Sequence, residues 1–322
     1  MSYFIFGGSG FIGTHLITLI DNIYPGTKIY NLDIVKNNHE GKSTYINCDV
    51  RSEINIDIPV TSEDVIFNFA AVHRTPGHPD QAYFETNIRG AENVCAFAEK
   101  FGIKKIVFTS SIAPYGAAED LKTEETLPTP NTPYGISKLV AEKIHTIWQA
   151  KKSNERQLTI VRPGVVFGKG ENGNFTRLYW GIRGGKFFYP GRKDTIKACI
   201  YVKELVRFML YRLGNHSEGV ELYNCTFESA FTIEQIVETM KKATGVQRTV
   251  VEVPGSLLMT VARIVGSLGG KALGICPARV KKLMISTNIC GKKLADSGYK
   301  FHYTFEEAIK DWYRDNDNKY LR

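Results

Sequence analysis

A tyrosine and a lysine four residues apart, Tyr134 and Lys138, stand at the start of a segment with helical spacing. Residues four apart lie on one face of a helix, so the lysine ammonium should face the phenol. The ammonium would favour the phenolate by Coulomb attraction and lower the pKa of the tyrosine. Upstream, Thr109-Ser110-Ser111 ends a predicted strand, where a hydroxyl can share the proton of a substrate alcohol. This spacing indicates acid–base chemistry at an alcohol carbon.

A glycine-rich loop lies near the N-terminus, between a strand-like run and a helix-like run. Gly7, Gly10 and Gly13 form a G-x-x-G-x-x-G pattern. Glycines there permit a tight turn and let a pyrophosphate approach the free N–H groups at the start of the helix. Asp33 ends the next predicted strand, 20 residues after Gly13. A carboxylate at this place accepts hydrogen bonds from an adenosine ribose and repels a 2′-phosphate, so we predict NAD rather than NADP.

Strand and helix signals alternate through the first half of the chain. The predicted strands are 2–6, 28–32, 43–47, 65–69, 105–109 and 158–162, and the predicted helices are 11–20, 80–101 and 134–151. This alternation predicts an α/β fold, a doubly wound parallel sheet of the Rossmann type with right-handed crossovers.

The pattern loosens in the second half of the chain. Residues 168–191 are rich in glycine and aromatics and are expected to be irregular, and helices resume at 202–213, 233–244, 257–268 and 305–313. We expect an NAD-binding Rossmann domain over 1–165, which also receives segments near 195–230. A smaller, mixed and discontinuous substrate-binding lobe is expected over 166–322.

Composition narrows the class of protein. The 322 residues are 43% hydrophobic and 23% charged, close to the globular average. The net charge of +8 comes from scattered basic residues rather than a continuous stripe, which disfavours nucleic-acid binding. The sequence has neither an apolar run of about 18 residues nor a signal-peptide pattern, so we expect no stable membrane insertion. Six cysteines without a C-x-x-C pair indicate reduced thiols in a cytoplasmic protein.

Further motifs follow in order along the chain. They are Asp49-Val50, Asn68-Phe69-Ala70-Ala71, Asn87, Ser110-Ser111 followed by Tyr115-Gly116, and Pro133-Tyr134-Gly135 followed by Ser137-Lys138. With the glycine loop and Asp33, they resemble the extended short-chain dehydrogenase/reductases, in the NAD-dependent epimerase/dehydratase group typified by UDP-galactose 4-epimerase. The resemblance is firm over 1–168 and looser beyond.

The resemblance implies a role for each matching residue. Tyr134 would be the general base and later the acid, Lys138 would hold the nicotinamide ribose, and Ser111 would hydrogen-bond the reacting hydroxyl. The other positions would contact NAD: Phe11 and Ile12 the pyrophosphate, Asp49 and Val50 the adenine, Ala70, Ala71 and His73 the cofactor channel, and Pro163 the nicotinamide amide. Asn87 would brace the strand near Ser111. His73 as a loop histidine and Asp49 as a helix cap are the plainer alternatives.

The same resemblance implies a nucleoside-diphosphate sugar as substrate. Its diphosphate would be held in the second lobe, where the candidates are Asn174, Arg177, Arg192, Lys197 and Arg279. Each of these is equally open to being a solvated surface side chain. Lys197 stands where many relatives carry an arginine, and lysine lacks the bidentate grip of a guanidinium. We expect epimerisation at C4 through a 4-keto intermediate, with hydride transfer by NAD and no metal.

Departures from the family pattern leave alternatives open. Ile112-Ala113 follows Ser111 where 4,6-dehydratases carry an Asp-Glu pair, which disfavours dehydration. Arg162-Pro163-Gly164-Val165 lacks an asparagine that galactose epimerases carry, which leaves galactose specificity open. A one-way reductase of a 4-keto nucleotide sugar, a sterol-type hydroxyl dehydrogenase and a dinucleotide-sensing protein are the alternatives. The apolar segment 257–268 is either a packed helix or close to a membrane. Relatives often pair through helices matching 80–101 and 134–151, so we expect a homodimer.

Overall fold

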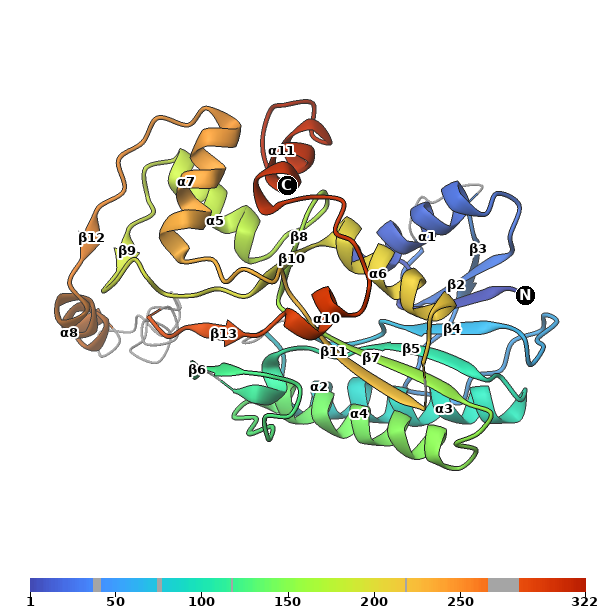
Figure 1. The fold of residues 1–322 in the computed structure, drawn as a ribbon. Coiled ribbons are helices and arrows are strands. Elements are labelled where there is room, and N and C mark those ends of the chain that lie inside the picture. Colours follow the sequence, from blue (N-terminus) through green and yellow to red (C-terminus); the bar gives the residue numbers. More distant parts are fainter. Residues whose placement is uncertain (37–41, 74–76, 117, 218, 266–283) are drawn as a thin grey trace. The chain divides into compact units, whose positions relative to one another are not determined.

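A computed structural model describes residues 1–36, 42–73, 77–116, 118–217, 219–265 and 284–322 (Figure 1). The chain forms two compact units, and each contains several stretches of sequence. Unit 1 is Met1–Gly116, Glu124–Pro163 and Val202–Cys225, and unit 2 is Ala117–Thr123, Gly164–Tyr201 and Thr226–Arg322.

Unit 1 is built on one parallel sheet. Its strands are β1 (Tyr3–Phe6), β2 (Ile29–Asp33), β3 (Thr44–Asn47), β4 (Val65–Asn68), β5 (Lys105–Thr109), β7 (Gln157–Pro163) and β11 (Val220–Cys225). Their order is β11-β7-β5-β4-β1-β2-β3, and every pairing is parallel. The order reverses between β1 and β4, and ligands of such sheets bind where the strand order reverses. The predicted doubly wound sheet is confirmed.

Helices cover both faces of this sheet (Figure 1). On one face α1 (Phe11–Ile23) packs against α6 (Val202–Gly214), and on the other α3 (Arg89–Lys100) packs against α4 (Pro133–Ala150). The predicted helix over 80–101 begins as α2 (Asp80–Tyr83) and passes through a π-helical turn, Phe84–Ile88, into α3.

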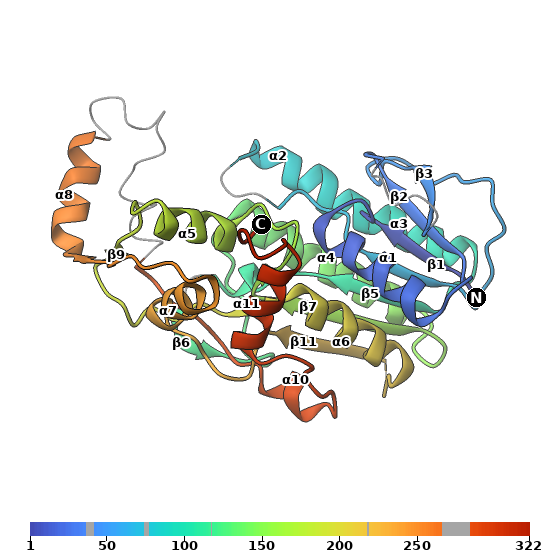
Figure 2. The same ribbon diagram turned by 90° about the horizontal axis from the view of Figure 1, so that it is seen from above.

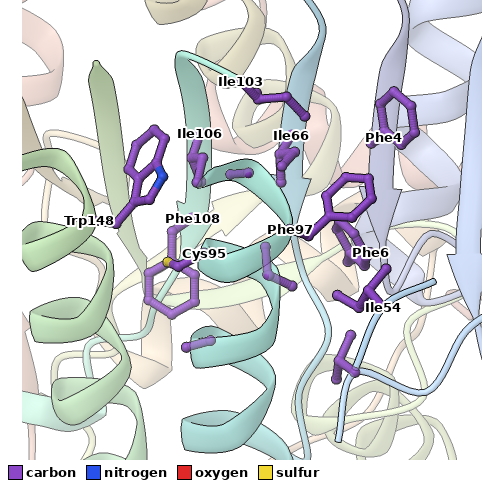
Figure 3. Close-up of a cluster of buried hydrophobic side chains, with 14 of the residues drawn as sticks. Phe4, Phe6, Ile54, Ile66, Cys95, Phe97, Ile103, Ile106, Phe108 and Trp148 are labelled. Atoms are coloured by element: carbon purple, nitrogen blue, oxygen red, sulfur yellow. The ribbon is translucent and has the colours of Figure 1, made fainter. Parts of the chain in front are cut away.

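The main core of unit 1 lies between the sheet and helices α3 and α4 (Figure 3). Phe4, Phe6 and Phe97 are at most 2% exposed, and the Phe97 ring lies 5.8 Å from each of the other two ring centres. Trp148 of α4 and Phe108 of β5 extend the same cluster toward the other edge. Burial of each such side chain stabilises the fold by about 1.5–3 kcal/mol, so the cluster fixes the strand ends that carry the site.

Unit 2 consists of short two-stranded sheets and helices. Its strands are β6 (Ala118–Lys122) with β13 (Thr287–Ile289), β8 (Val165–Phe167) with β10 (Cys199–Tyr201), and β9 (Tyr189–Pro190) with β12 (Glu252–Val253). Its helices are α5 (Asn174–Arg183), α7 (Ile233–Thr244), α8 (Gly255–Val265), α10 (Lys292–Asp296) and α11 (Phe305–Arg314). Stacked rings of Phe167, Phe175 and Tyr201 form its aromatic core.

Several elements differ from the prediction. The segment 168–191 is not irregular throughout, because it contains α5. Phe175, Tyr179 and Ile182 recur there at helical spacing and are buried, and the Glu171 carboxylate accepts a hydrogen bond from the Thr176 amide in the first turn (2.8 Å). Strand β11, at the edge of the sheet, was not predicted at all.

The structure also bears on the membrane and cysteine expectations. Among the described helices, none combines the length and the apolarity that crossing a bilayer requires. Five cysteines lie in the described residues and are free thiols, and four of them are buried. The sixth, Cys276, lies outside the described residues.

Candidate active site

The glycine loop links β1 to α1 and leaves no room for a side chain at Gly7 or Gly13. Gly7 has a φ of +76°, and a Cβ on it would lie 2.7 Å from the Ala70 amide nitrogen. A Cβ on Gly13 would lie 2.6 Å from Gly8 Cα, so the helix packs directly on the loop. Bulkier residues would break this turn, because the atoms they would meet are backbone atoms that cannot move aside.

The start of α1 is open to an anion. The helix is capped at Gly10 without any side-chain hydrogen bond, and Phe11 and Ile12 are its first two residues. Free amides and the positive end of a 13-residue helix together attract a phosphate. The loop and this helix end therefore fit the diphosphate of a dinucleotide.

The Asp33 carboxylate lies beside the loop at the end of β2. It accepts hydrogen bonds from the amides of Ser9 (3.0 Å) and Val35 (3.1 Å). Asn31 on the same strand donates to the Ser9 hydroxyl at 3.0 Å. The Asp33 carboxylate is thus held at the edge of the glycine loop, where it is predicted to accept hydrogen bonds from an adenosine ribose.

The other predicted cofactor positions lie at the ends of neighbouring strands. Asp49 forms an exposed ion pair with Arg51 at 2.6 Å, and the hydrogen bond from Arg51 lowers the pKa of the Asp49 carboxyl. Val50 is buried. Ala70 and Ala71 follow β4, half-buried, and His73 is exposed. The adenine and channel roles of these residues stay predictions.

Asn87 is buried and ties two segments together. Its amide oxygen accepts from the Val72 amide (2.8 Å), and its nitrogen donates to the Val72 carbonyl (3.0 Å) and the Ser137 hydroxyl (2.8 Å). It therefore braces the segment after β4 against α4, and these bonds do not involve the strand near Ser111.

Ser111 and Tyr134 share a hydrogen bond between their side chains. The Ser111 hydroxyl also accepts from the Ala113 amide at 3.1 Å. Helix α4 is capped by the Thr132 hydroxyl, which accepts from the Gly135 amide at 3.1 Å, and Pro133 occupies the first helical position. The cap fixes where the helix starts and so places Tyr134 beside Ser111.

The pKa of Tyr134 differs from the sequence expectation. Burial raises it, the hydrogen bond with Ser111 lowers it, and Tyr83, whose ring centre lies 6.2 Å away, raises it; the net direction is upward. The lowering expected from the lysine is therefore absent in the protein alone.

Lys138 is 2% exposed, and its Nζ donates to the Thr109 carbonyl at 2.5 Å and lies 4.5 Å from the Phe108 ring centre. Burial lowers the pKa of Lys138 to about 7, although the negative charge of Glu142 raises it in part. The buried ammonium is held by one carbonyl and one ring face, so its protonation responds to any new charge nearby.

A buried ion pair connects α4 to the strand ends that carry the site. Arg162 donates two hydrogen bonds to the Glu142 carboxylate, at 2.8 and 2.6 Å, and both side chains are 5% exposed or less. The Ser110 hydroxyl donates to the same carboxylate at 2.5 Å. The Arg162 guanidinium also lies 4.7 Å from the Tyr115 ring centre. This clamp joins β5, β7, α4 and the turn after Ser111.

Sequence reasoning missed the clamp, although signals for it were present. Glu142 lies four residues after Lys138, on the same face of α4 as Tyr134. Arg162 lies in a strand predicted to be buried, and a buried charge needs a partner. The Tyr115 hydroxyl donates to Asn224 of the unpredicted strand β11 at 2.9 Å, which extends the network.

Pro163 ends β7 and is buried at the same edge. Its carbonyl accepts from the Ile112 amide at 3.2 Å, next to Ser111. This bond brings the predicted nicotinamide-amide position and the predicted hydroxyl-binding residue together within unit 1.

The four described candidates for substrate binding all belong to unit 2. Asn174 begins α5 and accepts from Arg177 at 2.9 Å, with both residues exposed. Arg192 pairs with Asp194 (2.5 Å) and Glu119 (3.2 Å), and Lys197 donates to the Ile285 carbonyl (2.7 Å). Arg279 lies outside the described residues.

Comparisons with known proteins place these features in a family. A family model described as the NAD dependent epimerase/dehydratase family matches residues 3–226. An Escherichia coli O157:H7 protein, N-acetyl-alpha-D-glucosaminyl-diphospho-ditrans,octacis-undecaprenol 4-epimerase, is 32% identical over 308 residues, which cover 95% of this chain and 92% of that protein. The UDP-glucose 4-epimerase of Bacillus subtilis (strain 168) is 26% identical, covering 76% and 83%.

A solved structure shows the same fold. The UDP-glucuronic acid 4-epimerase of Bacillus cereus in complex with NAD superposes with a TM-score of 0.73 at 17% identity, covering 98% of this chain and 96% of that one. The parallel sheet, the glycine loop and the Ser111–Tyr134–Lys138 group agree with the family model that matches this chain. The chain therefore belongs to the NAD-dependent epimerase/dehydratase family.

Proposed function

We propose that this enzyme epimerises C4 of a sugar carried on a diphosphate. The observation that carries the proposal is the Ser111–Tyr134 hydrogen bond, formed beside Lys138 in the unit that also holds the glycine loop. Ser111 and Tyr134 together form a site where an alcohol can lose its proton. Such a site suits reversible oxidation at a hydroxyl-bearing carbon.

Ser111 and Tyr134 have separate roles in this reaction. Ser111 orients the C4 hydroxyl, and Tyr134 takes its proton and later returns it. Bound NAD supplies a hydride acceptor and donor. Since the pKa of Tyr134 is raised in the protein alone, deprotonation needs an added positive charge nearby, which the oxidised nicotinamide would provide. Inversion at C4 would follow when the 4-keto sugar turns in the site, so that C4 regains its hydrogen on the opposite face and Tyr134 returns the proton to the C4 oxygen.

Two carriers of the sugar are compatible with a diphosphate anchor. A nucleoside diphosphate is the substrate that the family resemblance implies. A polyprenyl diphosphate is the second candidate, because the E. coli relative is named for an undecaprenol-linked substrate and matches over 95% of this chain. In both cases we assign NAD binding to residues 1–165, with segments near 195–230, and substrate binding to the discontinuous remainder, 166–322.

The test combines turnover with a retained-cofactor assay. Purified protein is analysed for bound NAD and then incubated with UDP-, GDP- and dTDP-sugars and with synthetic polyprenyl-diphosphate N-acetylglucosamine. We expect interconversion of C4 epimers without net NAD consumption, abolished in Tyr134→Phe while NAD stays bound. Stoichiometric use of NADH would instead indicate a one-way reductase. Oxidation of a sterol would indicate a sterol-type dehydrogenase, and NAD binding without any turnover would indicate a sensor.

We also propose a cytoplasmic homodimer. Ile136, Val140 and Ile147 are 40%, 36% and 60% exposed along α4, at spacings of four and seven residues that keep them near one face. Phe84, in the turn before α3, is 37% exposed, whereas Phe97 and Trp148 belong to the core. Sedimentation of the Ile147→Asp variant tests the pairing: we expect dissociation to a monomer, and an unchanged mass would contradict it.

A further inference from the structure

Helix α8 is unusual among the helices of unit 2. Its sequence begins Gly-Ser-Leu-Leu-Met-Thr, yet none of the side chains described in it, 255–260, is buried, and Leu257 is 54% exposed. By contrast, α5, α7 and α11 each bury several apolar side chains. Within the segment 257–268, the described side chains are 257–260: Leu257 and Thr260 are exposed, and Leu258 and Met259 are half-buried. Apolar side chains that the described part of the chain leaves exposed indicate a partner.

Other apolar side chains are exposed next to α8. Phe188 and Val251 directly precede the paired strands β9 and β12 and are 39% and 60% exposed. The Tyr189 amide donates to the Val251 carbonyl at 2.9 Å, so the two apolar residues are neighbours across this pair. A Cβ on Gly191 would lie 3.3 Å from Gly255 Cα, which places the start of α8 against the end of β9.

Both views show α8 at the margin of unit 2, next to β9 (Figures 1 and 2), and Figure 1 shows β12 beside β9. We call Phe188, Val251 and Leu257, with their flanking cations, the end surface. Its three apolar members come from two separate stretches of chain, so their common exposure is a property of the fold rather than of one loop.

The chain around the end surface is basic. Residues 183–193 and 247–260 contain five cations and one acid, a net charge of +4. The cations are Arg183, Lys186, Arg192, Lys193 and Arg248, and the acid is Glu252. Arg192 and Lys193 are engaged in ion pairs. Within the described part of the chain, Lys186 and Arg248 form no ion pair, and both remain available to an anionic partner.

We propose that the end surface docks on an anionic lipid bilayer. A helix of 11 residues is only ~16 Å long, about half of the hydrocarbon thickness, so α8 would lie in the interface with Leu257 among the acyl chains. Basic side chains beside such a helix are attracted by anionic headgroups. A protein partner is a poorer fit, because a stable interface takes about 20–30 residues a side.

The proposal deepens the proposed function and rests on it for its purpose. The E. coli relative is named for a substrate on a long isoprenoid alcohol, which partitions into a bilayer. An enzyme that takes a polyprenyl-diphosphate sugar must reach the membrane surface, and the end surface would hold it there. Binding to lipid is measured without any substrate, so its failure and the failure of the epimerase assignment are separate results.

The experiment is flotation of the full chain with vesicles, either neutral phosphatidylcholine or phosphatidylcholine mixed with phosphatidylglycerol. The variants are Val251→Asp/Leu257→Asp for the apolar members and Lys186→Ala/Arg248→Ala for the cations. Leu127→Asp is the matched control, since Leu127 is 79% exposed in unit 1. Turnover of a soluble nucleotide sugar is measured for all of them, to show that each variant is folded.

We expect the wild-type protein and the control to float with anionic vesicles, and less so in high salt. Both end-surface variants should lose at least fivefold in bound fraction while turnover of the soluble substrate is unchanged. Three results would overturn the proposal: no flotation of the wild type, equal flotation of variants and wild type, or loss of a dimer in Val251→Asp/Leu257→Asp without any vesicle binding. The last result would assign the end surface to a second copy of the chain.

Discussion

Replacing Glu142 with glutamine tests the buried clamp, since it keeps the shape of the side chain and removes its charge. Glu142 accepts three hydrogen bonds, one from Ser110 and two from Arg162, and the pair is almost fully buried. Removing one partner of a buried ion pair costs about 3–5 kcal/mol, because the other charge is left without compensation. We therefore expect Glu142→Gln to lose about 3 kcal/mol or more of unfolding free energy.

The measurement is urea unfolding at pH 7, followed by fluorescence and circular dichroism to check that the transition is two-state. The control is Asp296→Asn: Asp296 pairs with Lys292 at 2.9 Å, with both side chains more than half exposed, and such surface pairs contribute about 0–1 kcal/mol. The double variant Glu142→Gln/Arg162→Met should lose less than the sum of the single changes, by about 1–3 kcal/mol.

A second readout separates the clamp from simple packing. The Glu142 charge is the group that raises the pKa of Lys138 against burial. Glu142→Gln should therefore lower the pKa of Lys138 below about 7, which NMR of isotope-labelled lysine can follow. A cost below about 1 kcal/mol, or an unchanged Lys138 titration, would refute the reasoning, since either result means that the charge is well solvated.

Three further predictions follow from the site. Gly13→Ala should weaken NAD binding at least tenfold in calorimetry, because its Cβ would lie 2.6 Å from backbone, whereas Gly214→Ala, with open space around it, should bind as wild type does. Because burial lowers the pKa of Lys138 to about 7, the unfolded state binds more protons above pH 7, and the stability of the wild type relative to Lys138→Met should rise from pH 7 to 9. Burial lowers the pKa of His145 to about 4, so stability relative to His145→Gln should fall as the pH drops from 6.5 to 4. A flat difference in either pH series would contradict the assigned pKa.

The fold of unit 1 was predictable because its signals are local. The strand over 105–109 was predicted with the bounds that the structure has, and so was the helix over 233–244 in unit 2. The glycine loop could also be predicted from the sequence, since a backbone that leaves no room for a Cβ admits only glycine. In these cases a few adjacent residues carry the whole physical reason.

Features that depend on distant partners were not predictable in this way. Strand β11 pairs only with β7, so its existence depends on a neighbour about 60 residues away. The pKa of Tyr134 was expected to fall because sequence spacing shows the lysine and not the burial, and the structure has burial outweighing the favourable hydrogen bond. Spacing predicts which groups meet, whereas their titration depends on what excludes water from them.

The clamp and Lys138 together explain how a buried site can hold its charges. Lys138 has one carbonyl acceptor at 2.5 Å, and its nearest opposing charge, Glu142, is already bonded to Arg162 and Ser110. A dedicated Lys138–Glu142 pair would fix the ammonium permanently, because a well-compensated buried cation does not titrate near neutrality. Burial lowers the pKa of Lys138 to about 7, and the charge of Glu142, which is itself bonded to Arg162, only partly opposes this effect. The arginine thus stabilises the fold, while the incompletely compensated lysine, on the same helix as Tyr134, stays responsive to a ligand's charge.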